Sequence, residues 1–236
     1  MIKTAFILGA GLGTRLRPLT ENCPKPLLCV RNKPIICHAM DRLIEVGVER
    51  FIVNTRHCAE VYDEKFPDKK YRGREIALSH EPILLDTGGG LKNIEHMLGG
   101  GDDNLLVYNG DILANLDLSR LVAHHEDAVA RGNCLATLLL RTNPSGNVNF
   151  DDDNECIADM RDRLRRAGTR RCGFTGIYCV SRKFFTEIPS GKIESVVEAF
   201  LRCIARGNNE IRGIVDDGGE WRDLGTPADF HAAELG

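Results

Sequence analysis

The first two-thirds of the chain alternate short apolar runs with longer amphipathic segments, and this alternation restricts the fold more than any other feature. The expected strands are residues 5–8, 51–53, 76–79, 105–108 and 134–140. The expected helices are residues 34–46, 57–66, 91–98 and 118–131. Strands that alternate with helices predict an α/β fold with a mixed, mainly parallel sheet. Because the apolar runs are continuous, we expect helices on both faces of that sheet.

The pattern changes after Arg141. The elements expected there are strands at residues 148–150, 156–160 and 174–180, a helix at 196–205, a strand at 211–215 and a helix after Pro227. Polar turns join the first three of these strands, which we interpret as a small antiparallel lid over one side of the sheet. The 236 residues contain no repeat and no linker, so they suit a single domain.

Charge and composition exclude several classes of protein. The net charge of −3 argues against a nucleic-acid-binding protein, which usually carries a basic excess. No run of about 20 apolar residues is present, so we expect no membrane span. The nine cysteines are odd in number and include no Cys-x-x-Cys, which favours free thiols in the reducing cytoplasm over disulfides or a zinc site.

A glycine-rich loop follows the first expected strand. Gly9, Gly11 and Gly13 lie directly after it, where bare backbone N–H groups can approach a phosphate chain. The loop does not fit a dinucleotide fingerprint, because the third glycine of that motif is replaced by Thr14 or Leu16. It does not fit a Walker A loop either, because threonine and arginine follow Gly13.

The rest of this loop combines prolines with cations. Prolines at positions 18, 24 and 26 prevent a long helix from starting after the glycines. The fixed cations are Arg15, Arg17 and Lys25. A plain glycine turn with solvated charges is the alternative, and this density of glycine, cation and proline makes it the weaker interpretation.

These residues resemble a known signature. Gly11-x-Gly13-Thr14-Arg15-x-x-Pro18-x-Thr20 followed by Pro24-Lys25-Pro26 is similar to the first motif of the sugar-1-phosphate nucleotidyltransferases. Four further stretches match the family's later motifs in order: Thr87-Gly88-Gly89-Gly90, Asn109-Gly110-Asp111, Phe174-Thr175-Gly176 and Trp221-Arg222-Asp223-Leu224-Gly225-Thr226. The resemblance therefore covers almost the whole chain. It implies a Rossmann-like fold of the nucleotide-diphospho-sugar transferase type.

The resemblance also implies a reaction and its residues. An oxygen of a sugar 1-phosphate attacks the α-phosphorus of a nucleoside triphosphate and expels pyrophosphate, without a covalent enzyme intermediate. Such transfers depend on positioning and on neutralising phosphate charge. Arg15 would bind the triphosphate, and Lys25 would hold the two phosphates where they meet. Asp111 and Asp223 would bind Mg²⁺.

The binding residues implied by the resemblance fall into two parts of the chain, about residues 1–140 for the nucleotide and 141–236 for the sugar. The expected nucleotide-binding residues are Leu8, Ala10, Gly11, Gly13, Thr14, Glu81, Thr87, Gly88 and Gly89. The expected sugar-binding residues are Asn109, Gly146, Thr175 and Gly176. The chain departs from the family at residues 160–166, where many relatives have Glu-Lys-Pro, whose lysine contacts the sugar phosphate, and this sequence has an arginine-rich stretch. Two interpretations are open: the arginines substitute for that lysine, or they belong to an exposed, solvated helix or loop.

The substrates are left open between alternatives. The motifs look most like N-acetylmuramate-1-phosphate uridylyltransferases of cell-envelope synthesis, and we expect UTP as the donor. Mannose- or heptose-1-phosphate guanylyltransferases using GTP are close rivals. A purine needs a deeper slot than a pyrimidine beside Leu8 and the triple glycine, Gly88-Gly89-Gly90. Because glycines have no side chain, we expect them to leave that slot open. A non-catalytic sugar-nucleotide-binding regulator is an alternative of another class, disfavoured because Arg15, Lys25, Asp111 and Asp223 are all present. A glycosyltransferase is disfavoured by the lack of Asp-x-Asp after a core strand.

Overall fold

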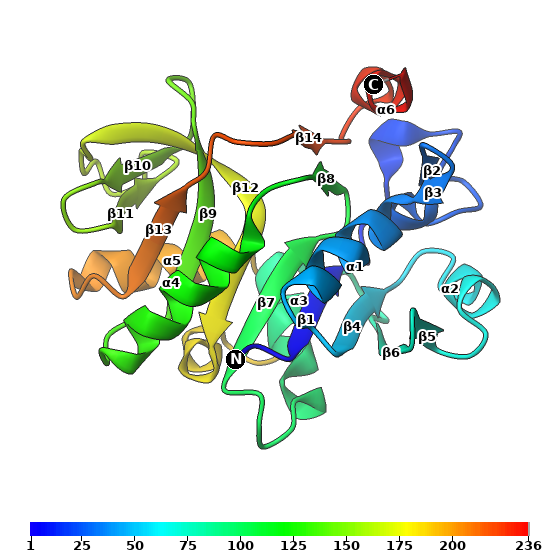
Figure 1. Cartoon of the computed structure of the whole chain (residues 1–236), viewed down its shortest axis with the longest axis horizontal. Coiled ribbons are helices and arrows are strands. Elements are labelled where there is room, and N and C mark those ends of the chain that lie inside the picture. The colour runs from blue at the N-terminus through cyan, green and yellow to red at the C-terminus, as the bar shows by residue number, and fades with distance from the viewer. Residues whose placement is uncertain (236) are drawn as a thin grey trace.

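A ten-stranded sheet runs through the computed structural model, which describes residues 1–235 (Figure 1). In spatial order its strands are β10 (Val148–Asp151), β11 (Cys156–Met160), β13 (Ile211–Val215), β9 (Ala136–Thr142), β12 (Arg170–Ser181), β7 (Asn104–Asn109), β1 (Thr4–Leu8), β4 (Arg50–Thr55), β6 (Arg74–His80) and β5 (Lys70–Tyr71). Two small ribbons complete the strands: β2 (Cys29–Val30) with β3 (Lys33–Pro34), and β8 (Ile112–Ala114) with β14 (Trp221–Asp223).

The sheet is mixed, as the sequence predicts. Strands β7, β1, β4 and β6 run parallel, and so do β9 and β13. Strand β12 is antiparallel to both of its central neighbours, β7 and β9. The prediction that residues 174–180 belong to a lid is therefore wrong, because β12 joins the two parallel parts inside the sheet. Strands β10 and β11 extend the sheet as a short antiparallel edge on this side, and β5 pairs antiparallel to β6 at the opposite edge.

Residues 1–235 form six α-helices. They are α1 (Ile35–Glu45), α2 (Glu60–Lys65), α3 (Asp86–Asn93), α4 (Leu118–Ala130), α5 (Val196–Arg206) and α6 (Pro227–Leu235). Helices α1 and α4 lie on one face of the sheet, and α3 and α5 lie on the other (Figure 1). The central strands feed both layers: in β1, Phe6 packs with the α3 and α5 side, and Ile7 packs with the α1 and α4 side. The expectation of a sheet covered on both faces is confirmed.

The glycine-rich segments differ in their local structure. Between residues 9 and 28 only single 3-10 turns form, at Thr14–Leu16 and Lys25–Leu27, which agrees with the prolines of that stretch. The second glycine segment was expected to precede a helix at residues 91–98. Instead, helix α3 begins at Asp86 and contains all three glycines in its first turns. Because glycine is a poor helix former, the sequence pattern did not predict that the helix begins before residue 91.

Two sequence-based exclusions can be compared with the fold. No helix within residues 1–235 is long and apolar enough to span a bilayer. All nine cysteines are free, and most of them are buried in the core.

Candidate active site

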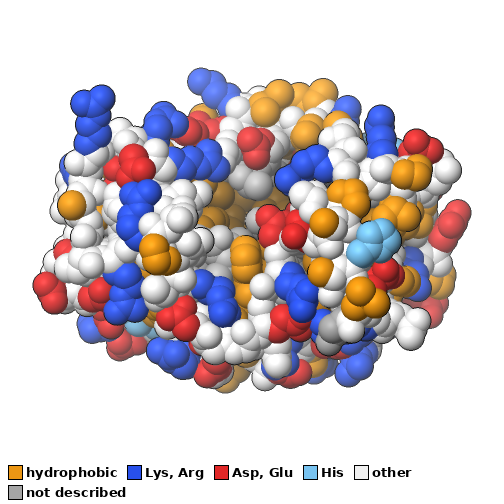
Figure 2. Space-filling model, turned by 90° about the horizontal axis from the view of Figure 1, so that it is seen from above, with side chains coloured by type: hydrophobic (Ala, Val, Ile, Leu, Met, Phe, Trp, Pro, Cys, Tyr) orange, Lys and Arg blue, Asp and Glu red, His pale blue; other side chains and the backbone are white. Residues whose placement is uncertain are grey.

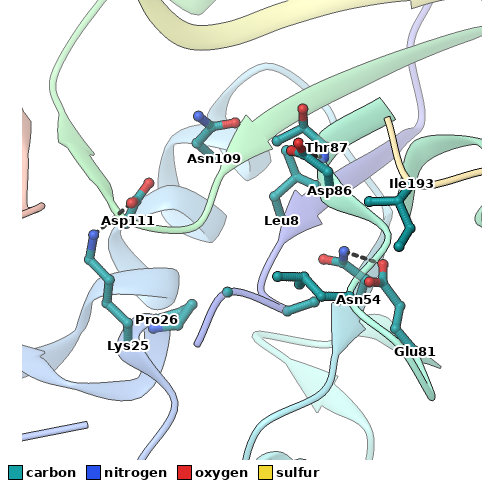
Figure 3. Close-up of a pocket in the computed structure, with 13 residues that line it drawn as sticks. Leu8, Lys25, Pro26, Asn54, Glu81, Asp86, Thr87, Asn109, Asp111 and Ile193 are labelled. Atoms are coloured by element: carbon teal, nitrogen blue, oxygen red, sulfur yellow. Dashed lines mark hydrogen bonds and ion pairs between the residues drawn. The ribbon is translucent and has the colours of Figure 1, made fainter. Parts of the chain in front are cut away.

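A cavity of about 470 Å³ opens at the carboxyl ends of β1 and β7, and Figure 2 shows the molecule hollowed at its centre. It is lined by Leu8, Ala10, Gly11, Lys25, Pro26, Asn54, Glu81, Leu84, Asp86, Thr87, Asn109, Asp111 and Ile193 (Figure 3). The end of β7 approaches β1 closely, since the N–H of Gly110 donates to the Leu8 carbonyl at 3.0 Å. A Cβ at Gly110 would lie 2.4 Å from that oxygen, so glycine permits the approach.

A lysine–aspartate pair marks one end of the cavity (Figure 3). The Lys25 ammonium lies 2.6 Å from the Asp111 carboxylate. The lysine side chain is only 9% exposed and the aspartate side chain is 33% exposed, so the aspartate faces the opening. Lys25 has two further N–H donors available for a ligand. The structure thus brings the two predicted residues together with their charges directed at the cavity.

The second predicted aspartate reaches the same place from the far end of the chain. Strand β14 pairs with β8 so that Asp223 lies opposite Ile112, and the N–H of Leu224 donates to the Asp111 carbonyl at 3.1 Å. Burial raises the pKa of Asp223, and the negative charge of Asp111 raises it further, against the opposing effects of Lys25 and Arg15. Two carboxylates converge here, and their oxygens could hold a hard divalent cation together with phosphate oxygens and water.

Arg15 lies beside Asp223 rather than in the first cavity. A Cβ at Gly225 would lie 3.1 Å from a guanidinium nitrogen of Arg15 and 3.1 Å from an Asp223 oxygen. These residues line a second cavity of about 650 Å³, which also contains Arg141 and Arg222. The Arg15 side chain has no hydrogen-bond partner among residues 1–235, so its donors are available to an anion.

The opposite end of the first cavity is held by an asparagine that the sequence analysis missed. The buried Asn54 side chain accepts a hydrogen bond from the Gly9 N–H at 2.6 Å and donates one to Glu81 at 2.7 Å (Figure 3). Asn54 thereby joins the first glycine loop to the segment that begins at Glu81. The available signal was its position at the end of the expected strand 51–53, where open α/β sheets place ligand-binding groups.

Glu81 is completely buried, and both of its carboxylate oxygens accept hydrogen bonds. One accepts from Asn54, and the other accepts from the Leu85 N–H at 3.0 Å. A Cβ at Gly90 would lie 2.8 Å from the first of these oxygens, so this glycine makes room for the pair. Glu81 lines the cavity, and its hydrogen bond to the Leu85 N–H also fixes the shape of the loop that follows it.

The triple glycine turns away from the cavity. The N–H groups of Gly88 and Gly89 both donate to the Glu194 carbonyl, at 2.8 and 3.0 Å, and neither residue lines the cavity. Thr87 does line it, while its hydroxyl accepts from the Val196 N–H. The expectation that these glycines leave the slot open is therefore wrong, because residues 192–196 close it.

The sequence profile described as nucleotidyl transferase matches residues 4–236. The chain belongs to this family. It is 34% identical over 229 residues to the mannose-1-phosphate guanylyltransferase of Mycobacterium tuberculosis, covering 96% of this chain and 62% of that protein. It is 31% identical over 249 residues to a UTP–glucose-1-phosphate uridylyltransferase of Synechocystis, covering 98% of this chain and again 62% of the relative. The chain thus spans less than two-thirds of either curated relative.

Solved structures show the same fold. A putative glucose-1-phosphate thymidylyltransferase from Bacillus anthracis superposes with a TM-score of 0.81, covering 100% of this chain and 94% of that one. The sequence identity is 21%, so the likeness establishes the architecture alone. The nucleotide-diphospho-sugar transferase fold expected from the motifs is confirmed.

Within this nucleotidyl transferase fold, the predicted sugar-side residues divide into two groups. Asn109 lines the cavity, and a Cβ at Gly176, whose φ is +80°, would lie 2.6 Å from its amide nitrogen. Thr175 instead turns its hydroxyl into the sheet, where it donates to the Leu139 carbonyl at 2.7 Å and is almost completely buried. Gly146 packs against β12, where a Cβ would lie 2.1 Å from the Cys172 carbonyl. Neither of these two lines the cavity.

The first glycine loop also divides. Leu8, Ala10 and Gly11 line the cavity. Gly13 adopts a left-handed conformation and its carbonyl accepts from the Thr20 hydroxyl at 2.8 Å, which closes the turn. Thr14 is exposed and begins the short 3-10 turn outside the cavity.

The arginines at residues 160–166 do not reach this site. Arg163 pairs with Glu198 of α5, and Arg166 donates to the Ile204 carbonyl at the end of the same helix. The alternative that they replace the family's Glu-Lys-Pro lysine is not supported for these two. Two arginines of the second cavity are engaged as well, since Arg141 donates to the carbonyls of Asp217 and Gly218 and Arg222 pairs with Glu220.

Proposed function

We propose that this chain transfers a nucleoside monophosphate from a nucleoside triphosphate to a sugar 1-phosphate and releases pyrophosphate. The observation that carries the proposal is the Lys25–Asp111 pair at one end of a cavity large enough for a nucleotide, with Asp223 next to Asp111 on the paired strand β14. Membership of the nucleotidyl transferase family supports it. So do the activities named for the two curated relatives, both of which act on sugar 1-phosphates.

In this reaction an acceptor phosphate oxygen forms a bond to the α-phosphorus, and the bond from that phosphorus to the bridging oxygen of pyrophosphate breaks. The chain needs to align the two phosphates and offset their charge. Lys25 suits this role because its ammonium is fixed by Asp111 and keeps N–H donors for phosphate oxygens. Arg15 suits the departing pyrophosphate, since its planar guanidinium can bind two phosphate oxygens at once.

Magnesium belongs to the proposal because the carboxylates fit it. Burial raises the pKa of Asp223, and the negative charge of Asp111 raises it further, so a cation beside these two carboxylates would offset both effects. Mg²⁺ is usually held by one or two carboxylates together with phosphate oxygens and water. When bound, it would neutralise charge on the phosphates of the donor. Asp111 and Asp223 would hold it, and Lys25 would keep Asp111 oriented.

Two donor nucleotides have support. UTP is favoured by the motifs. It is also favoured by the end of the cavity that holds Asn54 and Glu81, which we call the base end, because residues 192–196 pack onto Gly88 and Gly89 there and leave no deeper slot for a purine. GTP is favoured by the 34% identity to a mannose-1-phosphate guanylyltransferase. Each donor implies a sugar acceptor. If the donor is UTP, we propose an N-acetylated sugar phosphate as the acceptor, and if the donor is GTP, we propose mannose or heptose 1-phosphate.

Pyrophosphate release from each pair of nucleoside triphosphate and sugar 1-phosphate tests the proposal. Release with at least one pair, dependent on both substrates, is the expected result. The ratio of kcat/KM for UTP and GTP then decides the donor. Binding of a nucleotide sugar without release from any pair would instead support the non-catalytic regulator.

A further inference from the structure

An exposed isoleucine faces the base end of the cavity. Ile193 lines this cavity and is 64% exposed, so most of its apolar surface is free to contact a ligand. Leu84, from the opposite loop, lines it as well and is 37% exposed. Figure 3 shows Ile193 at the side of the cavity that holds Asn54 and Glu81, across from Lys25 and Asp111.

The segment that carries Ile193 is fixed by its backbone. We call residues 192–196 the strap. The Glu194 N–H donates to the Leu85 carbonyl at 3.1 Å, and the Glu194 carbonyl accepts from Gly88 and Gly89. The Val196 N–H donates to the Thr87 hydroxyl at 2.9 Å. Four hydrogen bonds therefore hold Ile193 in place, although its own side chain has few neighbours.

The triple glycine explains how the strap comes so close. A Cβ at Gly89 would lie 2.5 Å from the Lys192 carbonyl oxygen, and a Cβ at Gly88 would lie 2.8 Å from the Glu194 carbonyl oxygen. Backbone atoms cannot move aside as a flexible side chain can. These two glycines consequently serve the strap, which comes from the second half of the chain and forms one wall of the nucleotide cavity.

We propose that Ile193 packs against the face of the nucleobase and that the strap is the apolar wall of the base subsite. The proposal rests on the proposed function, because it assigns part of the same cavity to the donor nucleotide. An aliphatic side chain contacts the flat face of a base without reading its hydrogen-bonding edge. It therefore contributes affinity for uracil and for guanine alike, more for the larger purine, and leaves the choice of base to other groups.

The test is nucleotide binding by the full chain with Ile193→Ala. Loss of most of this exposed side chain should weaken UTP and GTP binding roughly five- to tenfold, as expected for the apolar area that a base would cover. Inorganic tripolyphosphate has the charges and no base, so its binding should stay unchanged. Ile83→Ala is the matched control: Ile83 is 53% exposed on the adjoining loop and does not line the cavity.

Two further variants separate contact from loss of structure. Ile193→Leu keeps the apolar surface and should bind nucleotides like the unaltered chain. Gly89→Ala should displace the strap and weaken the binding of nucleotides, but not the binding of tripolyphosphate. Unchanged UTP and GTP binding in Ile193→Ala would overturn the proposal, and so would an equal loss for tripolyphosphate.

Failure of the proposed function gives a different result. If the unaltered chain binds nucleotides but releases no pyrophosphate, the transferase is refuted while the binding contrast at Ile193 can still be measured. If the unaltered chain binds tripolyphosphate as tightly as any nucleotide, the base subsite itself is refuted.

Discussion

The two ends of the cavity are built in opposite ways. At the charged end, Asp111 pairs with Lys25, and Asp223 on the paired strand is near enough for the negative charge of Asp111 to raise its pKa further than burial alone. At the base end, Asn54 and Glu81 form a closed set in which every carboxylate oxygen has a donor. At the charged end, a ligand can therefore form ionic and hydrogen-bonding interactions that the protein leaves open. At the base end, the polar groups are already hydrogen-bonded within the protein, and this end contributes the shape of the cavity wall.

The two ends thus differ in what their side chains do: some neutralise the charge of a substrate, and others shape the wall of the cavity. Side chains that neutralise a substrate's charge must remain incompletely paired until the substrate arrives, which costs stability in the free protein. Side chains that shape a wall are satisfied beforehand, because an unpaired buried polar group would cost more than it contributes. Substitutions at the charged end should consequently lower the rate, and those at the base end should lower stability.

The largest effect is expected for Asp223→Asn. A neutral amide is a weak magnesium ligand, so kcat should fall about a hundredfold or more while the fold is retained. Relief of the repulsion with Asp111 should leave the melting temperature equal or higher. Asp229→Asn, in the same second cavity, is the control and should keep its rate within about twofold. Near-normal turnover of Asp223→Asn at limiting magnesium would remove this residue from the site.

A smaller loss is expected for Lys25→Ala, and its kinetic form should differ from that of Arg15→Ala. In the proposed reaction Lys25 would act where the two phosphates meet, so its loss should lower kcat by tens of fold with little change in KM. Arg15→Ala should lower kcat and also raise KM for the triphosphate. Lys33→Ala removes a lysine paired with Asp41 outside the cavity and serves as the control. Equal, small effects of the first two variants would make the loop purely structural.

At the base end, Asn54→Leu should act on stability. It leaves the Gly9 N–H unpaired and takes one donor from the buried Glu81 carboxylate, which should lower the free energy of unfolding by about 2 kcal/mol. Denaturant unfolding measures this loss. Asn93→Ala removes a hydrogen bond between neutral, half-buried groups and should cost about 1 kcal/mol or less. A rate loss in Asn54→Leu without any loss of stability would contradict the distinction between the two ends.

The smallest effect is expected for Thr175→Val. The hydroxyl of Thr175 donates to the Leu139 carbonyl inside the sheet, so its removal should cost about 1 kcal/mol of unfolding free energy. KM for the sugar 1-phosphate should be unchanged. A several-fold rise in this KM, measured at saturating triphosphate, would return Thr175 to the sugar site that the motif implied.

The sequence predicted the charged end better than the base end, for physical reasons. Asp111 ends an apolar strand and Lys25 lies in a proline-rich loop, so each carries a local signal of its own. Asn54 has its role only through partners 45 and 27 residues away, which no local pattern reveals. The triple glycine was assigned to the nucleotide because glycine indicates a close approach without naming the approaching group. Here that group is the strap.

The antiparallel pairing of β14 with β8 brings together two carboxylates from distant parts of the chain. Three residue pairs, Ile112–Asp223, Leu113–Arg222 and Ala114–Trp221, make up this ribbon. Separation of the ribbon would remove Asp223 from Asp111, while the hydrogen bonds that hold the strap to residues 85–89 would remain. A molecule in that state would offer a nucleotide its wall but not its second carboxylate, so opening and closing of a three-residue ribbon could switch the charged end on and off.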